Sequence, residues 1–214
     1  MLHSNQVVQL KWFLLAAIGS SSLALAQPVA RAEETHFRMQ RSAEVEQVLT
    51  NQDGEPFALV LAEGSVVMLS SKAAEHGYAA GQRVQVEGDA VETPINVVYY
   101  RARITRGGRL LQAADEQLAE QPKADSCAED RLTVQGRITA FLASPNGQLT
   151  GLVLSDGVVA LADGRLDPAG MIRGSELEVS GPSRQLESGM VVRIEKVAMI
   201  RPAWPNTVSA ASLR

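Results

Sequence analysis

The residues best suited to contact a ligand are an aromatic and several basic side chains. Tyr99, Arg101 and Arg103 follow one another at two-residue spacing, so on a strand they are expected to project from one face. Such a cluster is suited to an anionic partner. Lys72 and Arg165 form a second candidate set, because they occupy equivalent positions in the internal repeat described below. The alternative for both sets is that they are ordinary solvated surface charges.

Residues that would support catalysis or bind a metal are sparse. After the first 26 residues the histidines are His36 and His76, and neither lies near a serine in a nucleophile context. No second cluster of ligating side chains accompanies either histidine. We therefore expect no catalytic residue, no metal site and no cofactor. Cys127, the single cysteine, lies in a polar segment and is expected to be an incidental surface thiol.

The first residues have the parts of a secretory signal. Lys11 precedes an apolar run over residues 12–18, and Ala24-Leu25-Ala26 has the pattern of a cleavage site. A transmembrane anchor is the alternative, but the run is shorter than the ~20 residues that cross a bilayer. The sequence therefore predicts a periplasmic or secreted protein, cleaved near Ala26, with no stable membrane span in the mature chain.

The rest of the chain contains an internal repeat at an offset of 93 residues. Comparison of residues 41–104 with residues 134–197 gives 12 identical pairs in 64, five of them glycines. Chance pairing would give roughly a third as many, so we infer a duplication. In the last strand, however, the apolar residues of the two copies differ in parity, which predicts a one-residue slip of register there. Matched positions include Gly54, Leu59, Gly81 and Gly88, which recur as Gly147, Leu152, Gly174 and Gly181.

Each copy has the pattern of about five short strands. In the second copy, alternation over residues 132–142 predicts a long first strand, and an Asn-Gly turn follows it. Further strands are expected over residues 149–154, 158–161, 176–181 and 190–200. Residues 162–173 lack alternation and are expected to form a loop or a single helical turn. This order of elements is that of the oligonucleotide/oligosaccharide-binding (OB) barrel.

Two segments carry a closer resemblance to this barrel class. Residues 145–157, PNGQLTGLVLSDG, resemble the hairpin of small bacterial proteins of the class, and residues 174–181 resemble their fourth strand. The resemblance implies an all-β chain of two tandem five-stranded OB-like barrels. It departs after Gly157, where a Pro and His run is expected and the chain has VVALAD instead, so no ligand role tied to that run is carried over.

The predicted organisation has five parts joined in order. They are a signal peptide (1–26), the first barrel (38–106), a linker (107–130), the second barrel (131–201) and a tail that is expected to be disordered (202–214). The linker is polar and is suited to a short helix, with Leu110, Leu111, Ala114 and Leu118 on one face and an end before Pro122.

Charge and aromatic content narrow the function. The chain has 20 Lys and Arg against 24 Asp and Glu, a net charge of −4, which disfavours nucleic acid as a partner. Single-stranded nucleic acid also requires stacking aromatics, and the two copies share none: Phe57 aligns with Thr150, and Tyr99 with Val192. We expect a non-enzymatic exported binding module that acts in the cell envelope on a protein or an anionic glycan or lipid. The alternative is an exported single-stranded nucleic-acid-binding protein that uses the arginines of strand five.

Overall fold

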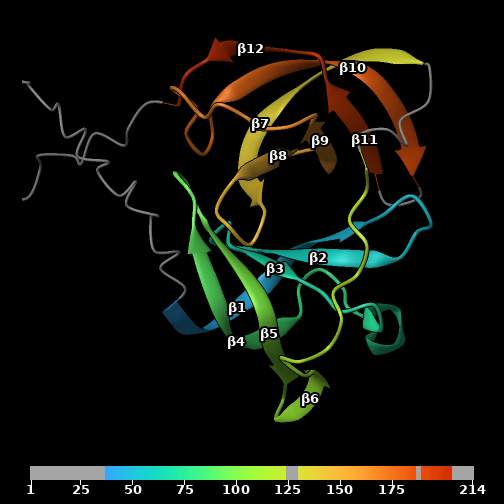
Figure 1. Cartoon of the computed structure of the whole chain (residues 1–214), viewed down its shortest axis with the longest axis vertical. Helices are drawn as coiled ribbons and strands as arrows, with labels where there is room; N and C mark the ends of the chain where they lie inside the picture. The colour runs from blue at the N-terminus through green and yellow to red at the C-terminus, as the bar shows by residue number, and fades with distance from the viewer. Residues whose placement is uncertain (1–36, 124–129, 187–188, 204–214) are drawn as a thin grey trace, which may run out of the picture. The chain divides into compact units, whose positions relative to one another are not determined.

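A computed structural model describes residues 37–123, 130–186 and 189–203 (Figure 1). The expected signal peptide, His36, Cys127 and the tail after Ala203 lie outside the described residues. The described chain is almost entirely β-structure with one 3-10 turn, and it contains no helix long and apolar enough to cross a membrane.

The first barrel closes through five strands. β1 pairs with β2 and β4, β3 pairs with β2 and in parallel with β5, and β4 pairs with β5. The insert between the third and fourth strands is the 3-10 turn η1 (Ala73–His76). The strands are β1 (Phe37–Thr50), β2 (Pro56–Leu61), β3 (Val66–Met68), β4 (Arg83–Glu92), β5 (Val97–Arg106) and the short added strand β6 (Arg109–Gln112).

The second barrel repeats this order, with its fifth strand divided in two. β7 pairs with β8 and β10, and β9 pairs with β8 and in parallel with β11. β10 then pairs with both β11 and β12. The strands are β7 (Arg131–Ala143), β8 (Leu149–Leu154), β9 (Val158–Ala162), β10 (Glu176–Leu186), β11 (Gly189–Ile194) and β12 (Lys196–Arg201).

The chain is therefore all-β, with two closed five-stranded barrels in tandem, as the sequence pattern predicted. In each barrel the first strand lies between the second and the fourth, and the fifth strand runs parallel to the third. This is the strand order of an OB-like barrel, in which a closed sheet leaves few unpaired strand edges.

The two copies keep one register throughout, so the expected one-residue slip is wrong. Val66 pairs with Val98 in the first barrel, and the residues 93 positions later, Val159 and Val191, pair with each other in the second. The offset still holds after the irregular point of strand five, where Glu87 pairs with Arg103 and Ser180 with Lys196. Both copies have a bulge at this point, and because an extra residue moves the following side chains to the other face, the parity of apolar residues along strand five does not report its register.

A glycine in each copy makes this bulge possible. A Cβ atom on Gly88 would lie 2.8 Å from the carbonyl oxygen of Tyr100 and 2.8 Å from the Cα atom of Ala102. A Cβ atom on Gly181 would lie only 1.9 Å from the carbonyl oxygen of Arg193. Both glycines are therefore required for the close approach of strand five, which explains why they match in the repeat.

The short helix that the linker sequence could form is not present in residues 107–123. Arg109–Gln112 instead forms β6, which pairs with the end of β5. Gln112 is fully buried, and its side chain accepts a hydrogen bond from Ser70 N–H (2.7 Å) and donates one to the Ala102 carbonyl (3.0 Å). Leu118 then forms an isolated bridge with Ser70. These long-range bonds to barrel 1 outweigh a local helical preference, which is weak in a short polar segment.

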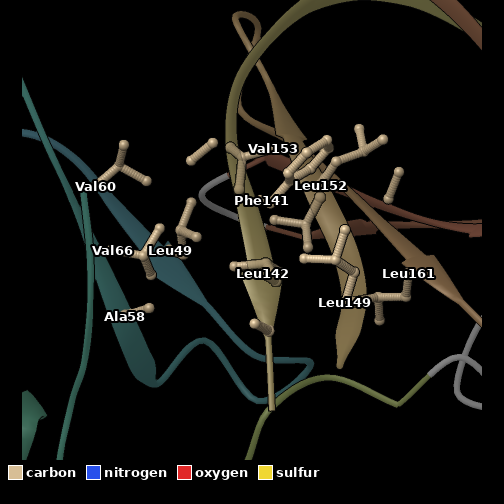
Figure 2. Close-up of a cluster of buried hydrophobic side chains, with 14 of the residues drawn as sticks. Leu49, Ala58, Val60, Val66, Phe141, Leu142, Leu149, Leu152, Val153 and Leu161 are labelled. Atoms are coloured by element: carbon tan, nitrogen blue, oxygen red, sulfur yellow. The ribbon is translucent and has the colours of Figure 1, made fainter. Parts of the chain in front are cut away.

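Both sides of three strands of the first barrel are buried. Leu59, Val67 and Tyr99 belong to the core inside the barrel. Their neighbours Val60, Val66 and Val98 belong to a second hydrophobic cluster that also contains the core of the second barrel, and we call this cluster the shared core. Figure 2 shows Val60, Val66, Leu49 and Ala58 on strands of barrel 1 together with Phe141, Leu142 and Val153 of barrel 2.

Candidate functional site

The structure separates the three candidate residues of strand five, so the expectation that they share one exposed face is wrong. Tyr99 is completely buried inside barrel 1, whereas Arg101 and Arg103 are exposed. The cause is the bulge, since Tyr99 pairs with Ala90 before it and Arg103 pairs with Glu87 after it. Two-residue spacing indicates a common face only where a strand is regular.

Arg101 is held by an acidic neighbour. It has a backbone φ of 42°, which is uncommon for a residue with a Cβ atom, and it lies in the bulge opposite Gly88. Its Nε and Nη2 atoms donate to Asp89 Oδ2 over 2.9 and 2.5 Å. Arg103, by contrast, makes no ion pair or hydrogen bond through its side chain with the described part of the chain, and it borders a shallow surface pocket with Gln40 and Thr105. Glu87, the cross-strand partner of Arg103, lines the same pocket, so an acidic side chain lies near Arg103 even though the two form no ion pair.

The surface that OB-like barrels use for ligands is covered in both copies. This surface is the outer face of the second and third strands. In barrel 1 it carries Ala58, Val60 and Val66, and each is at most 1% exposed. In barrel 2 it carries Val153 and Val159, which are also buried. Because all five belong to the shared core, each barrel covers the ligand face of the other.

Polar contacts at the edge of the shared core join the two barrels. The N–H group of Phe141 donates to Asn96 Oδ1 (2.9 Å), and Asn96 Nδ2 donates to the Phe141 carbonyl (3.2 Å). The Tyr100 hydroxyl donates to the Ala143 carbonyl. The Asn96 amide thus satisfies both backbone groups of a fully buried residue, in the way that a neighbouring strand would. Nothing in the local sequence around Asn96 indicates this partner.

Arg173 provides a second junction. Its Nη2 atom donates to the Ala62 carbonyl (3.0 Å) and lies 3.8 Å from Glu46 Oε2. Its guanidinium group lies against Gly64, where a Cβ atom would be 2.9 Å from Arg173 Cζ. Gly64 therefore serves both the tight turn between β2 and β3, with its φ of +89°, and the approach of Arg173.

All three tyrosines are shielded from water, and none forms a stacking platform. Burial is the main cause that raises the pKa of the hydroxyls of Tyr78, Tyr99 and Tyr100 above the usual value of 10.0. Glu116 contributes to the rise at Tyr78, and Arg41 opposes the rise at Tyr99. Among the described aromatic residues, the four buried ones are Phe57, Tyr99, Tyr100 and Phe141, and the two half-buried ones are Phe37 and Tyr78.

A pocket of about 410 Å³ lies where three loops meet, and this size suits a small ligand or one unit of a polymer. The loop between β7 and β8, the insert after β9 and the turn between β4 and β5 contribute to it. The loop after the first strand is one of the loops that bind ligands in this barrel class. Residues lining the pocket include Pro94, Gln148, Leu149, Arg165, Leu166 and Pro168.

The pocket combines an apolar floor with a cationic side chain. Leu149 and Leu166 are 5% and 7% exposed, so they form a floor that is already largely buried. Arg165 is exposed, and its guanidinium group makes no ion pair or hydrogen bond with any residue that the structure describes. Asn146 Oδ1 accepts from the N–H group of Gln148 (3.3 Å), which fixes the turn that carries the Gln148 side chain. A guanidinium group in a pocket that is also lined by apolar side chains suits a ligand that carries a carboxylate or phosphate.

The structure does not bring Lys72 and Arg165 into equivalent surroundings. Lys72 is exposed at the start of η1, and Arg165 lines the loop pocket of barrel 2. Sequence reasoning identified Arg165 but missed Gln148 and Pro94. Gln148 had a signal, because it directly follows the Asn-Gly turn of the loop. Pro94, Gln148 and Arg165 line one pocket only because the two barrels pack together.

Other kinds of site are not seen among the described residues. They contain no group of three or more His, Cys, Asp or Glu side chains placed to hold a metal ion. His76 packs edge-on against Tyr78, with ring centroids 6.1 Å apart. The other histidine considered as a possible metal ligand, His36, lies outside the described part of the chain.

Comparison with known proteins gives distant structural likeness only. No family model and no curated protein matches the chain. A deletion mutant of the single-stranded DNA-binding protein from Thermus aquaticus is 16% identical, with 79% of this chain and 85% of that chain covered and a TM-score of 0.24. The wild-type form is 14% identical, with 78% and 81% covered and a TM-score of 0.21. At these values the likeness supports no inference about function.

Proposed function

We propose that this chain is an exported, non-enzymatic binding module that holds an anionic partner in the cell envelope at the loop pocket of barrel 2. The observation that carries the proposal is the guanidinium group of Arg165, which pairs with no residue that the structure describes and lines the pocket together with the buried side chains of Leu149 and Leu166. A bidentate contact from an arginine to a carboxylate or phosphate is a strong polar interaction, especially beside apolar side chains that exclude water. An acidic glycan, an acidic protein segment and an anionic lipid headgroup share this chemistry.

The covered ligand faces also support a loop site. A partner that used the outer face of the second and third strands would have to separate the two barrels and expose the shared core. Separation would return many fully buried apolar side chains to water, at roughly 25 cal/mol per Å². The loops at the ends of the strands remain accessible without any such change. In the folded chain, the loops are therefore accessible to a ligand and the outer faces of the second and third strands are not.

The test measures binding of four probes by calorimetry at low salt. The probes are alginate, a polyglutamate peptide, vesicles of phosphatidylglycerol and single-stranded DNA. We expect one of the first three to bind, and Arg165→Glu to weaken that binding by about tenfold or more. Arg137→Glu is the matched control, because Arg137 is an exposed arginine of the same barrel that does not line the pocket. Absence of binding by all four probes, or equal losses in both variants, would refute the proposal.

Single-stranded nucleic acid remains the second candidate, and one observation favours it. Arg103 is exposed and makes no side-chain hydrogen bond or ion pair among the described residues, and it borders a pocket lined by Gln40, Gln85, Thr105 and the acidic Glu87. The lack of an exposed aromatic beside it speaks against this candidate, because stacking supplies much of the affinity for single strands. If DNA binds with a steep dependence on salt, and Arg103→Glu rather than Arg165→Glu abolishes binding, the second candidate replaces the first.

Export is part of the proposal and has its own measurement. The apolar run and the Ala24-Leu25-Ala26 pattern support it. We expect mass spectrometry of the protein recovered from the periplasm or medium to find Gln27 as the first residue. Recovery of the full-length chain from the cytoplasm alone would contradict export while leaving the binding test valid.

A further inference from the structure

Part of the linker lies along barrel 1 as an extended peptide. We call residues 113–120 the linker strap. The N–H group of Ala119 donates to the Leu69 carbonyl (2.8 Å), just after β3. The N–H group of Ser71 in turn donates to the Gln117 carbonyl (2.9 Å). Bonds in both directions between alternate residues are those of an antiparallel strand pair, so the linker strap is bound through its backbone, like a peptide added to the edge of a sheet.

The linker strap also contacts the first loop of barrel 1 and the shared core. In the loop between β1 and β2, Asn51 Nδ2 donates to the Glu120 carbonyl over 3.4 Å. Asn51 Oδ1 accepts from the N–H group of Glu55 over 3.0 Å and so orders the same loop. Ala119 of the strap is 8% exposed and belongs to the shared core. The strap is therefore held by backbone bonds, by a loop side chain and by apolar contact.

An acidic side chain of the linker strap lies beside the insert between β3 and β4. The nearby Ser70 hydroxyl is the main cause that lowers the pKa of Glu116, and burial opposes this lowering. Smaller effects that also lower the pKa come from the Ala113 N–H group and from Lys72 and His76 of the insert. Lys72 therefore acts on a carboxylate that belongs to the strap.

The internal repeat relates the site of the strap in barrel 1 to the loop pocket of barrel 2. Subtraction of 93 takes Arg165 to Lys72 and Gln148 to Glu55. In barrel 2 the first loop and the insert line the pocket, and in barrel 1 the same two parts contact the strap. Barrel 1 thus binds a peptide of its own chain where barrel 2 has a pocket.

The differences between the copies favour an anionic occupant in barrel 2. Asp53 and Glu55 of the first loop are replaced by Asn146 and Gln148, so two carboxylates give way to two amides. Among the described residues that line the pocket, Arg165 alone carries a charge. The lining of the pocket is therefore positive, and amide groups beside the cation can pair with the backbone of a peptide.

Two acidic residues near Arg165 limit where a carboxylate can bind. Asp163 is exposed and stands where barrel 1 has Ser70. Asp167 is also exposed, and its Oδ1 atom accepts from the N–H group of Ala169 over 3.0 Å. Neither aspartate is among the described residues that line the pocket. A carboxylate inside the pocket therefore meets the guanidinium group, whereas one at the end of β9 is repelled by Asp163.

We propose that the pocket of barrel 2 binds an extended peptide segment of a partner protein, with a Glu or Asp side chain of that segment at Arg165. This inference rests on the proposed function and narrows its anionic partner to one chemical class. The linker strap supports it, because a segment that contains Asp115, Glu116 and Glu120 lies at the equivalent site of barrel 1. The apolar floor of the pocket receives an apolar side chain of the peptide, as the shared core receives Ala119 of the strap.

The test uses a peptide with the sequence of residues 112–121, QAADEQLAEQ, which we call the strap peptide. Its control is the amide peptide, QAANQQLAQQ, in which every Asp and Glu is replaced by Asn or Gln. Calorimetry with the full chain at low salt is expected to detect binding of the strap peptide and none of the amide peptide. The reason is that a carboxylate gives the guanidinium group a charge-assisted hydrogen bond that an amide cannot give.

Three variants of the full chain assign the binding site. Arg165→Ala is expected to weaken binding of the strap peptide by about tenfold or more. Arg137→Ala is the matched control, because Arg137 is an exposed arginine of the same barrel that does not line the pocket. Lys72→Ala reports on exchange of the peptide with the linker strap, and we expect it to change the affinity by less than about twofold. Circular dichroism checks that all three variants keep the β-structure.

Further probes separate this inference from the proposed function. If alginate or phosphatidylglycerol vesicles bind through Arg165 while the strap peptide and polyglutamate do not, the inference is wrong and the proposed function stands. If none of these anionic probes binds, both are wrong. Three other results would overturn the inference alone: equal binding of the amide peptide, equal losses in Arg165→Ala and Arg137→Ala, or a loss that appears only in Lys72→Ala.

Discussion

Replacement of Asn96 by alanine tests whether the two barrels are one folding unit. Asn96 bonds both backbone groups of Phe141, at 2.9 and 3.2 Å, and Phe141 is completely buried. Asn96→Ala leaves an N–H group and a carbonyl group of barrel 2 without a partner. A buried polar group left unpaired costs about 1–3 kcal/mol, so the free energy of unfolding should fall by about 2–5 kcal/mol. This is a large share of the 5–15 kcal/mol that is typical of a folded protein.

The assay is equilibrium unfolding in guanidinium chloride, followed by circular dichroism and by hydrogen exchange of amides in both barrels. Because the shared core contains residues of both barrels, we expect one transition in the parent protein and one, at lower denaturant, in the variant. A loss of 3 kcal/mol should lower the Tm by about 6–12 °C for a chain of this length. Amides of β8 in barrel 2 should lose protection together with those of β4 in barrel 1.

The control is Gln135→Ala, which removes an exposed side-chain hydrogen bond to Glu178 within barrel 2. Its effect should stay within about 0.5 kcal/mol. Two results would refute the reasoning: a change in Asn96→Ala no larger than that of the control, or a parent protein that unfolds in two separate transitions. Either would mean that the contacts between the barrels do not couple their stabilities.

Three further predictions follow from glycine geometry and from the tyrosines. Gly64→Ala and Gly54→Ala should each cost about 1–2 kcal/mol for a left-handed backbone, and Gly64→Ala should cost more because its Cβ atom also displaces Arg173, a difference that thermal unfolding of the two variants measures. Gly181→Ala should cost more than about 3 kcal/mol, because its Cβ atom meets the Arg193 carbonyl of the backbone, and folding at the level of Gly54→Ala would contradict this. The three tyrosines have raised pKa values, so the native state retains their protons more strongly than the unfolded state. The stability that the raised pKa values provide is complete below pH 10 and falls as the pH rises above 10. Phenolate absorbance should therefore appear together with unfolding. Titration of all three tyrosines in a protein that stays folded would contradict this prediction.

Local sequence patterns determined the strands and their number. Alternation, turn glycines and an Asn-Gly turn depend on neighbouring residues along the chain, and they predicted two tandem five-stranded OB-like barrels correctly. The repeat was also readable, since glycines required by turns and close approaches keep their positions. Even the register of the last strand followed the constant offset of 93, although the change of parity near Gly88 and Gly181 pointed to a slip. The parity was misleading because a bulge changes the faces of strand five at the same place in both copies, which leaves the offset between the copies unchanged.

The sequence also carried a signal for the covered faces. Residues 58–61, 66–69 and 158–161 are continuous apolar runs rather than alternating ones, which is typical of strands buried on both sides. What the runs do not specify is the partner that covers the second side.

Only the tertiary structure decided which surfaces remain for a ligand. Burial of Tyr99, pairing of Arg101 with Asp89 and burial of the strand faces each result from contacts between residues far apart in sequence. The same is true of the pocket that joins Pro94 to Arg165. Charge and residue type can be read one residue at a time. Whether a charge is paired, or a face covered, depends on which distant segment packs against it, and the sequence pattern of a strand holds no record of that segment.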